Sequence, residues 1–393
     1  MKTVYLDHCA TTPLNPDVLM AMLPFLRDSF GNPSSAYTLG RTAREAVEEA
    51  RGKVAALIGA NASEIVFTSG GTEADNLAIQ GIARVRKDRG NHIVTSAIEH
   101  HAVLRACEYL ARNGFSVTFL PVDHHGIVNP GDVIKALTDE TILVTIMHSN
   151  NEVGTIEPIS EIGRITTERG VTFHTDAVQS VGKVPLNVKE LQVDLLSIAA
   201  HKLYGPKGIG ALYIREGTRI DPILYGGEQE KGMRSGTENV ASIAGLGRAC
   251  ELARETVALR MDEIRKMRDA LQERISAAVP GLVINGHPVS RLPNCLSVSV
   301  PGIMAEAIVR DLDARGIAVS AGSACTSHSV EISHVLSAMG LPKETAQGTV
   351  RFSLGIANTA NEIEYAAAAF VEVVEKLKTL SEIENSLGSR RCY

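Results

Sequence analysis

The sequence contains no tryptophan, and aromatic residues make up only 4% of its 393 residues. Proteins that bind single-stranded nucleic acid stack bases on aromatic side chains, so no such platform is expected here. The formal charge of −6 adds a second argument, because binding to phosphate backbones needs an excess of lysine and arginine. The composition therefore predicts no nucleic-acid partner.

Cysteines are few and apolar runs are short. The six cysteines are scattered along the chain, and no two of them form a C-x-x-C pair. This pattern favours a reducing compartment over a disulfide framework or a zinc site. No apolar run reaches the roughly 20 residues of a membrane-spanning helix, and Asp7 interrupts any apolar start typical of a signal peptide. We therefore expect a cytoplasmic protein without a membrane partner.

The rest of the composition is that of a globular enzyme. Hydrophobic residues make up 44% of the chain, and the mean hydropathy is near zero. The length allows one large and one small domain. We expect the large domain at residues 16–260 and the small domain at residues 1–15 together with 261–393. A long helical pattern from near Asn239 to about Ala278 is expected to lead out of the large domain.

Strand and helix patterns alternate from residue 65 onwards. Such alternation predicts an α/β fold with a mainly parallel sheet that is covered by helices on both faces. The seven expected strands of the large domain are 65–68, 92–97, 115–120, 141–147, 171–175, 194–199 and 210–214. The expected small-domain strands are 282–285, 295–300, 317–320 and 349–354, and the last helix is expected at 360–378. On the helix that starts near residue 40, the charged stripe of Arg44, Glu48 and Arg51 is expected to face solvent.

The segment 194–210 begins as a buried strand, with Leu195, Leu196 and Ile198, and ends in a turn set by glycines and a proline. Lys202 stands at the tip of that strand. Burial there would lower the pKa of its amine and make it a usable nucleophile, as a Schiff-base lysine requires. A strand-end lysine that reaches solvent is the equally weighted alternative for this segment alone.

Asp176 ends another short apolar strand, 171–175. A pyridoxal 5'-phosphate (PLP) site needs a carboxylate that keeps the pyridine nitrogen protonated. Neighbouring parallel strands bring their carboxyl ends to the same edge of a sheet, so Asp176 and Lys202 are expected to meet there. Taken alone, Asp176 is better explained as the N-cap of a helix that starts near Val178.

A strand at 65–68 runs into Gly70, Gly71 and Thr72, and a helical pattern follows. Glycines let the backbone approach a ligand closely, and a helix N-terminus offers free N–H groups to an anion. Gly71 and Thr72 therefore predict a phosphate cradle. The segment is not a Walker A motif, because no Lys-Ser/Thr follows the glycines, and it lacks the spacing of the dinucleotide fingerprint.

Together with other motifs, these segments resemble the cysteine desulfurases of the NifS/IscS type, which are class-V aminotransferase-family PLP enzymes with the aspartate aminotransferase-like fold. The resemblance covers nearly the whole chain. Its motifs stand at 5–7 (Tyr-Leu-Asp), 10–13 (Ala-Thr-Thr-Pro), 30–35 (Phe-Gly-Asn-Pro-Ser-Ser), 68–73 (Thr-Ser-Gly-Gly-Thr-Glu), 99–100 (Glu-His), 150–152 (Asn-Asn-Glu), 174–179 (His-Thr-Asp-Ala-Val-Gln), 201–202 (His-Lys), 234–239 (Arg-Ser-Gly-Thr-Glu-Asn), 323–327 (Ser-Ala-Cys-Thr-Ser) and 351–355 (Arg-Phe-Ser-Leu-Gly).

The resemblance implies PLP as the cofactor, held as a Schiff base on Lys202 with Asp176 on its pyridine nitrogen. His100 is implied to stack on the ring and to serve in acid/base transfers, for which a flat imidazole is suited. Asn151 is implied to orient the cofactor or the substrate. Gln179 resembles the residue that hydrogen-bonds the ring hydroxyl oxygen.

Further implied contacts concern the cofactor phosphate. His201 and the backbone before it resemble phosphate ligands. Ala199 stands where relatives usually carry a serine, so one hydroxyl contact is expected to be missing. Thr237 resembles the hydroxyl that reaches the phosphate of the partner subunit, which predicts a homodimer with shared sites.

Two residues are expected to act on the substrate. Arg351 lies on an otherwise apolar strand, where burial without a carboxylate partner is costly. Its planar fork suits the α-carboxylate of an amino acid, and a structural salt bridge is the alternative. Cys325 lies in a loop at about 320–334, and the ten residues 320–329 include no large apolar side chain. This composition favours a moving loop, and the Cys325 thiolate is the expected nucleophile.

The implied reaction converts L-cysteine to L-alanine and leaves a persulfide on Cys325, with Lys202 moving the Cα proton. The persulfide would supply an iron–sulfur scaffold protein or a thiolation carrier. Selenocysteine lyase and another PLP aminotransferase are the enzyme alternatives, although an aminotransferase needs no loop cysteine. An inactive scaffold of the same fold is the non-enzyme alternative, and it would be expected to show damage at Lys202, Asp176, His100 or Cys325, all of which are present.

Some features stand apart from the family pattern. His8-Cys9 replaces a usual Asn-Asn pair, and we hypothesise that Cys9 could accept or compete for sulfur.

Adjacent histidines do not share a helical face, so the pairs at 100–101 and 124–125 predict no metal site. We expect His101 to point away from the site.

Overall fold

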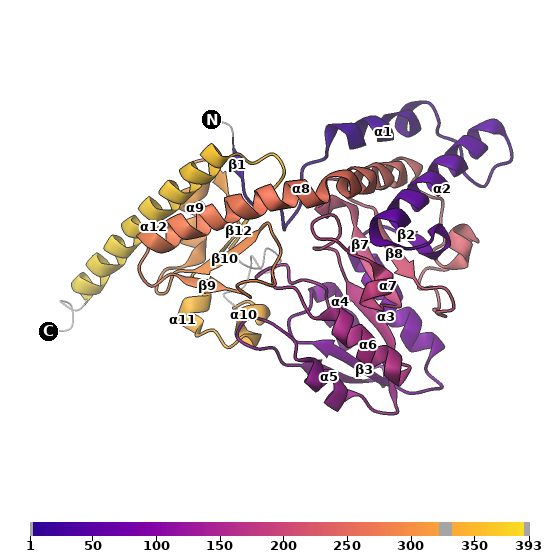
Figure 1. Ribbon diagram of the computed structural model, residues 1–393, viewed down its shortest axis with the longest axis horizontal. Helices are drawn as coiled ribbons and strands as arrows, with labels where there is room; N and C mark the ends of the chain where they lie inside the picture. The colour runs from indigo at the N-terminus through magenta and orange to yellow at the C-terminus, as the bar shows by residue number, and fades with distance from the viewer. Residues whose placement is uncertain (1–2, 322–331, 389–393) are drawn as a thin grey trace.

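A computed structural model of the protein describes residues 3–321 and 332–388 (Figure 1). A seven-stranded sheet in the order β2-β8-β7-β6-β5-β3-β4 forms its centre. Only β8 runs antiparallel to its neighbours within this sheet, so the predicted mainly parallel seven-stranded sheet is confirmed. Its strands are β2 (Ile65–Thr68), β3 (His92–Ser96), β4 (Ser116–Leu120), β5 (Thr141–Thr145), β6 (Thr172–Asp176), β7 (Leu195–Ala199) and β8 (Gly210–Ile214).

Alternate side chains of each strand enter two different cores, because successive residues of a strand point to opposite faces of the sheet. On β7, Leu196 and Ile198 pack into the core beneath α2 and α8, whereas Leu195 packs into the core beneath α3 and α4. Helices therefore cover both faces, as the alternating pattern predicted. The helices are α1 (Pro16–Arg27), α2 (Thr38–Ile58), α3 (Gly71–Val85), α4 (His101–Arg112), α5 (Pro130–Ala136), α6 (Ile159–Arg169), α7 (Val188–Leu191) and α8 (Val240–Ala278).

A second, smaller core follows the long helix α8. There β10 (Cys295–Ser299) lies between β12 (Thr349–Ser353) and β9 (Val283–Asn285) in an antiparallel sheet. The N-terminal strand β1 (Val4–Tyr5) pairs in parallel with β11 (Ile317–Ala318). The remaining helices are α9 (Ala305–Asp313), α10 (His334–Ala338), α11 (Lys343–Ala346) and α12 (Ala360–Gly388), the last of which continues past its predicted end at residue 378.

Helix α8 extends along both parts of the molecule (Figure 1). Near its start it packs against α1 and α2, and it also packs against α12. The side chains of Leu246 and Ala249 enter the core of the seven-stranded sheet, and those of Leu271 and Ile275 enter the second core. The division of the chain into domains at residue 260 stays a prediction.

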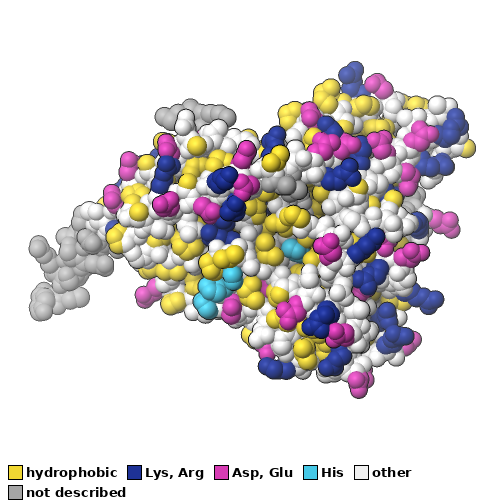
Figure 2. Space-filling view, viewed as in Figure 1, with side chains coloured by type: hydrophobic (Ala, Val, Ile, Leu, Met, Phe, Trp, Pro, Cys, Tyr) yellow, Lys and Arg dark blue, Asp and Glu magenta, His cyan; other side chains and the backbone are white. Residues whose placement is uncertain are grey.

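The surface and the helices bear on two classes of partner that the sequence analysis did not expect, nucleic acid and membrane. Figure 2 shows lysine and arginine interspersed with aspartate and glutamate over the visible face, without a continuous basic stripe. Phosphate backbones bind to such stripes, so this face offers them no obvious footprint. Within residues 3–321 and 332–388, no helix has the length and apolar character needed to cross a membrane.

Arg51 does not face solvent, so the expectation for the charged stripe on α2 was wrong at this residue. Its side chain is buried, and its guanidinium nitrogens lie 2.7 Å from both carboxylate oxygens of Glu230. It also donates to the carbonyl of Ile65 at 2.8 Å and lies 4.7 Å from the centre of the Phe67 ring. Glu230 is distant in sequence, and so the helical pattern alone could not indicate this pairing.

We predict that Arg51→Ala lowers the free energy of unfolding by about 3–5 kcal/mol, because it leaves the Glu230 carboxylate buried without its partner. Urea denaturation measures the change. Arg44→Ala, on the exposed side of the same helix, is the matched control and should cost less than about 1 kcal/mol. Equal losses in the two variants would contradict a structural role for the buried pair.

Candidate active site

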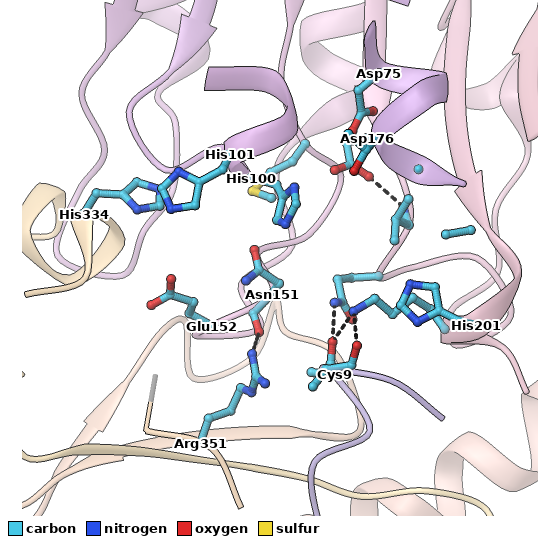
Figure 3. A pocket seen from close by; sticks show the side chains of 18 residues that line it. Cys9, Asp75, His100, His101, Asn151, Glu152, Asp176, His201, His334 and Arg351 are labelled. Carbon is cyan, nitrogen blue, oxygen red and sulfur yellow. Dashed lines mark hydrogen bonds between the residues drawn. The ribbon is translucent and has the colours of Figure 1, made fainter. Parts of the chain in front are cut away.

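The carboxyl ends of β5, β6 and β7 meet at one edge of the large sheet, and a pocket opens there (Figure 3). Its cavity volume is about 290 Å³. Parallel strands place the residues that follow them on the same edge, which explains why segments distant in sequence converge. The pocket is lined by ten of the residues predicted from the sequence, namely Gly71, Thr72, His100, Asn151, Asp176, Gln179, Ala199, His201, Lys202 and Arg351.

Lys202 lies directly after β7, on the short 3-10 helix η2 (Ala200–Lys202). Its Nζ donates to the carbonyls of Cys9 at 2.5 Å and Ala10 at 2.7 Å, so the side chain ends at the pocket and not in open solvent. Burial, assisted by the charge of Lys183, lowers the pKa of Lys202 to about 8. A large share of the amine is therefore neutral, and nucleophilic, near pH 8.

Asp176 is the last residue of β6 and is buried at the pocket (Figure 3). Its Oδ1 accepts a hydrogen bond from the Val178 backbone N–H at 2.9 Å. The capping bond considered from the sequence thus exists, but residues 178–180 form a turn and not a helix. Burial raises the pKa of Asp176, and the nearby His100 opposes that rise. The carboxylate therefore lies in a buried setting that favours contact with a cation.

A second carboxylate, Asp75 of α3, lies beside Asp176 (Figure 3). It is 1% exposed, and its Oδ1 has no hydrogen-bond partner among the described residues. Burial, followed by the charge of Asp176, raises the pKa of Asp75 well above its ordinary value. A proton on Asp75 removes the repulsion between the two groups and leaves Asp176 as the ionised member. The sequence analysis gave Asp75 no role, although an acidic residue between Ala74 and Leu77 on a buried helix face was a usable signal.

His100 both caps a helix and lines the pocket. It is the N-cap of α4, where its Nδ1 accepts a hydrogen bond from the Ala102 N–H at 3.2 Å, and its side chain also lines the pocket. Because Nδ1 accepts, the neutral ring carries its proton on Nε2. Burial lowers the pKa of His100, which favours this neutral form.

His101 lines the pocket too, so the expectation that it points away was wrong. Its ring centre lies 4.9 Å from that of His334, whose Nε2 donates to the carbonyl of Glu99 at 2.9 Å (Figure 3). The sequence could not pair His101 with His334, because the two are brought together only by the packing of α10 against the start of α4. Among the described residues there is no His, Cys, Asp or Glu group arranged to hold a metal ion.

Arg351 lies in the middle of β12 and is buried beside the pocket. One of its terminal nitrogens lies 2.7 Å from Oδ1 of Asp7, and the other donates to the Asn151 carbonyl at 2.6 Å. The structural salt bridge that the sequence left open is therefore present. Nε of Arg351 has no hydrogen-bond partner among the described residues, so the guanidinium retains an unused donor.

The N-terminus of α3 has the features of an anion cradle. No side chain caps it, and Gly70 has a φ of 152°, which side-chain-bearing residues rarely adopt. A Cβ on Gly71 would lie 2.8 Å from a methyl carbon of Val178, so only glycine permits this close approach. Across the pocket, Nδ1 of His201 lies 3.1 Å from Oγ1 of Thr11, and burial lowers the pKa of His201 to about 4. The cradle thus offers backbone N–H groups and a neutral imidazole.

Gln179 is held on both sides. Its Nε2 donates to the carbonyl of Cys9 at 2.9 Å, and its Oε1 accepts from Nζ of Lys183 at 3.0 Å. Asn151 is placed by its neighbour Asn150, whose Oδ1 accepts from the backbone N–H of Glu152 at 2.8 Å and so shapes the turn. Hydrogen bonds thus fix the side chain of Gln179 and the backbone turn that carries Asn151.

Of the predicted site residues, Cys325 and Thr237 are not among the ten named above. Cys325 falls within 322–331 and lies outside the described residues. Thr237 is exposed and belongs to the segment between β8 and α8. Pocket residues to which the sequence analysis assigned no site role are Ala10, Asp75, His101, Met147, Glu152, Val178 and His334.

The residues around the pocket fit PLP. The buried carboxylate of Asp176 suits a pyridine nitrogen, and the Lys202 amine suits an aldehyde. The uncapped N-terminus of α3 suits a phosphate, and the neutral ring of His100 offers a flat surface between these groups (Figure 3). Charge and hydrogen-bonding capacity thus match the three ends of the cofactor.

Comparison with known proteins points to the same chemistry. The model of the aminotransferase class-V family matches residues 4–366. The chain is 51% identical to cysteine desulfurase IscS of Dictyoglomus turgidum over 380 residues, which cover 97% of this chain and 96% of the relative. It is 50% identical to cysteine desulfurase IscS of Methanosarcina thermophila over 382 residues, with 97% and 94% covered.

Solved structures agree with this likeness. A NifS-like protein superposes with a TM-score of 0.90 at 40% identity, over 95% of this chain and all of that one. The structure of SspA in complex with cysteine superposes with a TM-score of 0.81 at 38% identity, over 91% of this chain and all of that one. Enzymes of this family depend on PLP. The chain therefore belongs to the class-V aminotransferase family, among the cysteine desulfurases of the NifS/IscS type.

Proposed function

We propose that the protein is a PLP-dependent cysteine desulfurase, which converts L-cysteine to L-alanine and holds the released sulfur as a persulfide on Cys325. The observation that carries this proposal is the convergence of Lys202, Asp176 and Arg351 on one pocket. An amine, a buried carboxylate and an arginine are the groups that a PLP enzyme acting on an amino acid needs. The 51% identity to a cysteine desulfurase supports the choice of substrate.

Several residues would hold the cofactor. Lys202 would bind its aldehyde as a Schiff base, and Asp176 would keep its pyridine nitrogen protonated. The N-terminus of α3 with Thr72, together with His201, would hold the phosphate, and Gln179 would contact the ring hydroxyl. Bound PLP supplies an electron sink that weakens the bonds at the substrate Cα.

The remaining roles concern protons and the substrate. Lys202, with its pKa lowered to about 8, would accept and return the Cα proton near neutral pH. His100, neutral and with its proton on Nε2, would exchange a proton on the opposite side of the site. Arg351 would bind the substrate carboxylate through its terminal nitrogens, in competition with Asp7. Asn151 would line the substrate position.

Sulfur transfer would depend on Cys325, whose thiolate attacks the substrate sulfur and becomes the persulfide. The bond between the substrate sulfur and Cβ breaks, and its electron pair stays with Cβ, which takes up a proton to become the methyl group of alanine. An acceptor protein, either an iron–sulfur scaffold or a thiolation carrier, would then take the sulfur. The acceptor and the cytoplasmic location stay predictions.

The active form is proposed to be a homodimer in which Thr237 reaches the partner's phosphate site. The exposure of Thr237 and its absence from the pocket lining of its own chain support this arrangement. A further support is the group of large apolar side chains exposed on and around α1 and the start of α2. These are Leu19, Met20, Leu26, Phe30, Tyr37 and Leu39.

We predict that Lys202→Ala lowers the rate of sulfide and alanine formation from L-cysteine by at least about 100-fold, because the covalent anchor and the proton carrier are both lost. The two products are measured together in the presence of a reductant. Lys207→Ala, an exposed lysine five positions along, is the control and should keep the rate. Desulfuration that persists in the Lys202 variant would refute the assignment.

Cys325→Ala is expected to keep PLP bound while losing the protein persulfide, because this residue is proposed to act on sulfur and not on the cofactor. Cofactor absorbance and mass spectrometry of the protein after treatment with L-cysteine measure the two properties. Cys250→Ala, at a buried site in the core under α8, serves as the control and should retain both. Full sulfur transfer by the Cys325 variant would exclude this role.

The lowered pKa of Lys202 predicts how PLP uptake by the cofactor-free protein depends on pH. Only the neutral amine attacks an aldehyde, so the rate should rise about tenfold per unit below pH 8 and level off above about 8. Cofactor absorbance followed after mixing measures the rate. A rate that continues to rise towards the ordinary lysine value of 10.5 would contradict the burial effect.

A further inference from the structure

Two cysteines that the proposed reaction does not use meet beside the pocket. Cys9 follows β1 and lines the pocket (Figure 3), and Cys295 is the first residue of β10. They are 1% and 0% exposed, neither is in a disulfide, and they share a small apolar cluster with Leu292. The Cys295 thiol donates to the carbonyl of Glu152, another residue that lines the pocket, at 3.8 Å.

Backbone pairing holds the two thiols together. The Cys9 N–H donates to Oγ of Ser353 at 2.8 Å, and Ser353 is the residue paired with Cys295 across β10 and β12. The residue before Cys295, Asn294, brings its Nδ2 to 3.9 Å from the Cys9 sulfur. The N-terminal segment is thus held to the start of β10 directly through Asn294 and indirectly through Ser353 of β12.

The charges around Cys9 favour its thiolate. Lys183 is 5% exposed, and its Nζ donates to the neutral amide of Gln179. Among the described residues it forms no ion pair with a carboxylate, which is costly for a buried cation. Lys202 and Arg351 add their positive charges at Cys9. The neighbouring Cys295 thiol, together with these charges, lowers the pKa of Cys9 well below its ordinary value, and the nearness of Cys9 raises the pKa of Cys295.

Two other buried cysteines differ from Cys9 in the direction of their pKa shift. Cys107 lies in the apolar core beneath α3 and α4, and Cys250 lies in the core beneath α8. Burial raises the pKa of Cys107 to about 12 and also raises the pKa of Cys250. Both behave as buried apolar side chains, so burial alone does not explain the setting of Cys9.

We propose that Cys9 and Cys295 form a peroxide-reactive thiol pair at the pocket, with Cys9 as the attacking sulfur and Cys295 as the resolving one. Hydrogen peroxide, which is small enough to enter through the pocket, is the oxidant. The Cys9 thiolate attacks one oxygen, the O–O bond breaks, and hydroxide leaves to become water, so that Cys9 becomes a sulfenic acid. The Cys295 sulfur then displaces the second oxygen as water, and an S–S bond forms. One peroxide takes up two electrons and the two thiol protons and yields two waters.

The pair would act on the site through the backbone of Cys9. The carbonyl of Cys9 accepts hydrogen bonds from both Lys202 and Gln179 (Figure 3). Cys295 belongs to the strand that pairs with β12, which carries Arg351. A disulfide would therefore tie the carbonyl that holds Lys202 to the sheet that holds Arg351. It would also keep Cys9 from irreversible oxidation to the sulfinic acid.

The test treats the PLP-loaded full-length protein with stoichiometric hydrogen peroxide, followed by alkylation, digestion without reduction, and mass spectrometry. The expected product is a peptide pair linked through Cys9 and Cys295 that dithiothreitol separates. In Cys295→Ser, Cys9 should instead react with dimedone as the sulfenic acid. Cys107→Ala is the control variant, and it should form the linked pair as the unaltered protein does.

Alkylation without oxidant supplies a second measurement on the unaltered protein, which does not depend on a variant that folds. At pH 7, Cys9 should react about tenfold faster than Cys107 or Cys250 with a small alkylating reagent. Equal rates, Cys9 left reduced by peroxide, or a disulfide from Cys9 to any cysteine other than Cys295 would each overturn the proposal.

Discussion

The parallel pairing of β5, β6 and β7 is the constraint on which the site depends. Asp176 is paired with Ser197, and His174 with both Thr145 and Leu195, so the ends of the three strands are held in a fixed register. A shift of one residue would turn the Asp176 side chain to the other face of the sheet. The residues after these strands then reach the same edge, where a ligand site can form.

The N-terminal segment supplies further contacts that hold the pocket side chains in place. The carbonyl of Cys9 accepts from Lys202 and Gln179, and the carboxylate of Asp7 pairs with Arg351. One short segment, residues 7–10, thus contacts both residues at the edge of the large sheet and β12. The segment therefore positions both Lys202, which follows the large sheet, and Arg351 of the smaller sheet. A change in this segment would displace both side chains.

Burial sorts the ionisable groups of the site into charged and neutral ones. His148 and His174 lie in the interior, where desolvation lowers their pKa values to about 4 and about 3 and keeps both rings neutral. Burial and the neighbouring Asp176 raise the pKa of Asp75 well above its ordinary value, which favours the protonated form. The charges of Asp176 and Arg351 at the pocket are of the signs that a cofactor nitrogen and a substrate carboxylate can use.

The sequence by itself determined the sheet, the strand ends and the chemical type of the site. Periodicity predicts these because it is a local property, and the strands were found within about two residues of their expected bounds. The motif around Lys202 and the one around Asp176 were also local, so both residues could be named before any contact was known. Contacts between segments distant in sequence were decided only by the tertiary structure. The burial of Arg51 against Glu230, the meeting of His101 with His334, and the pairing of Cys9 with Cys295 carry no local signal, because each partner looks ordinary until packing brings the other beside it.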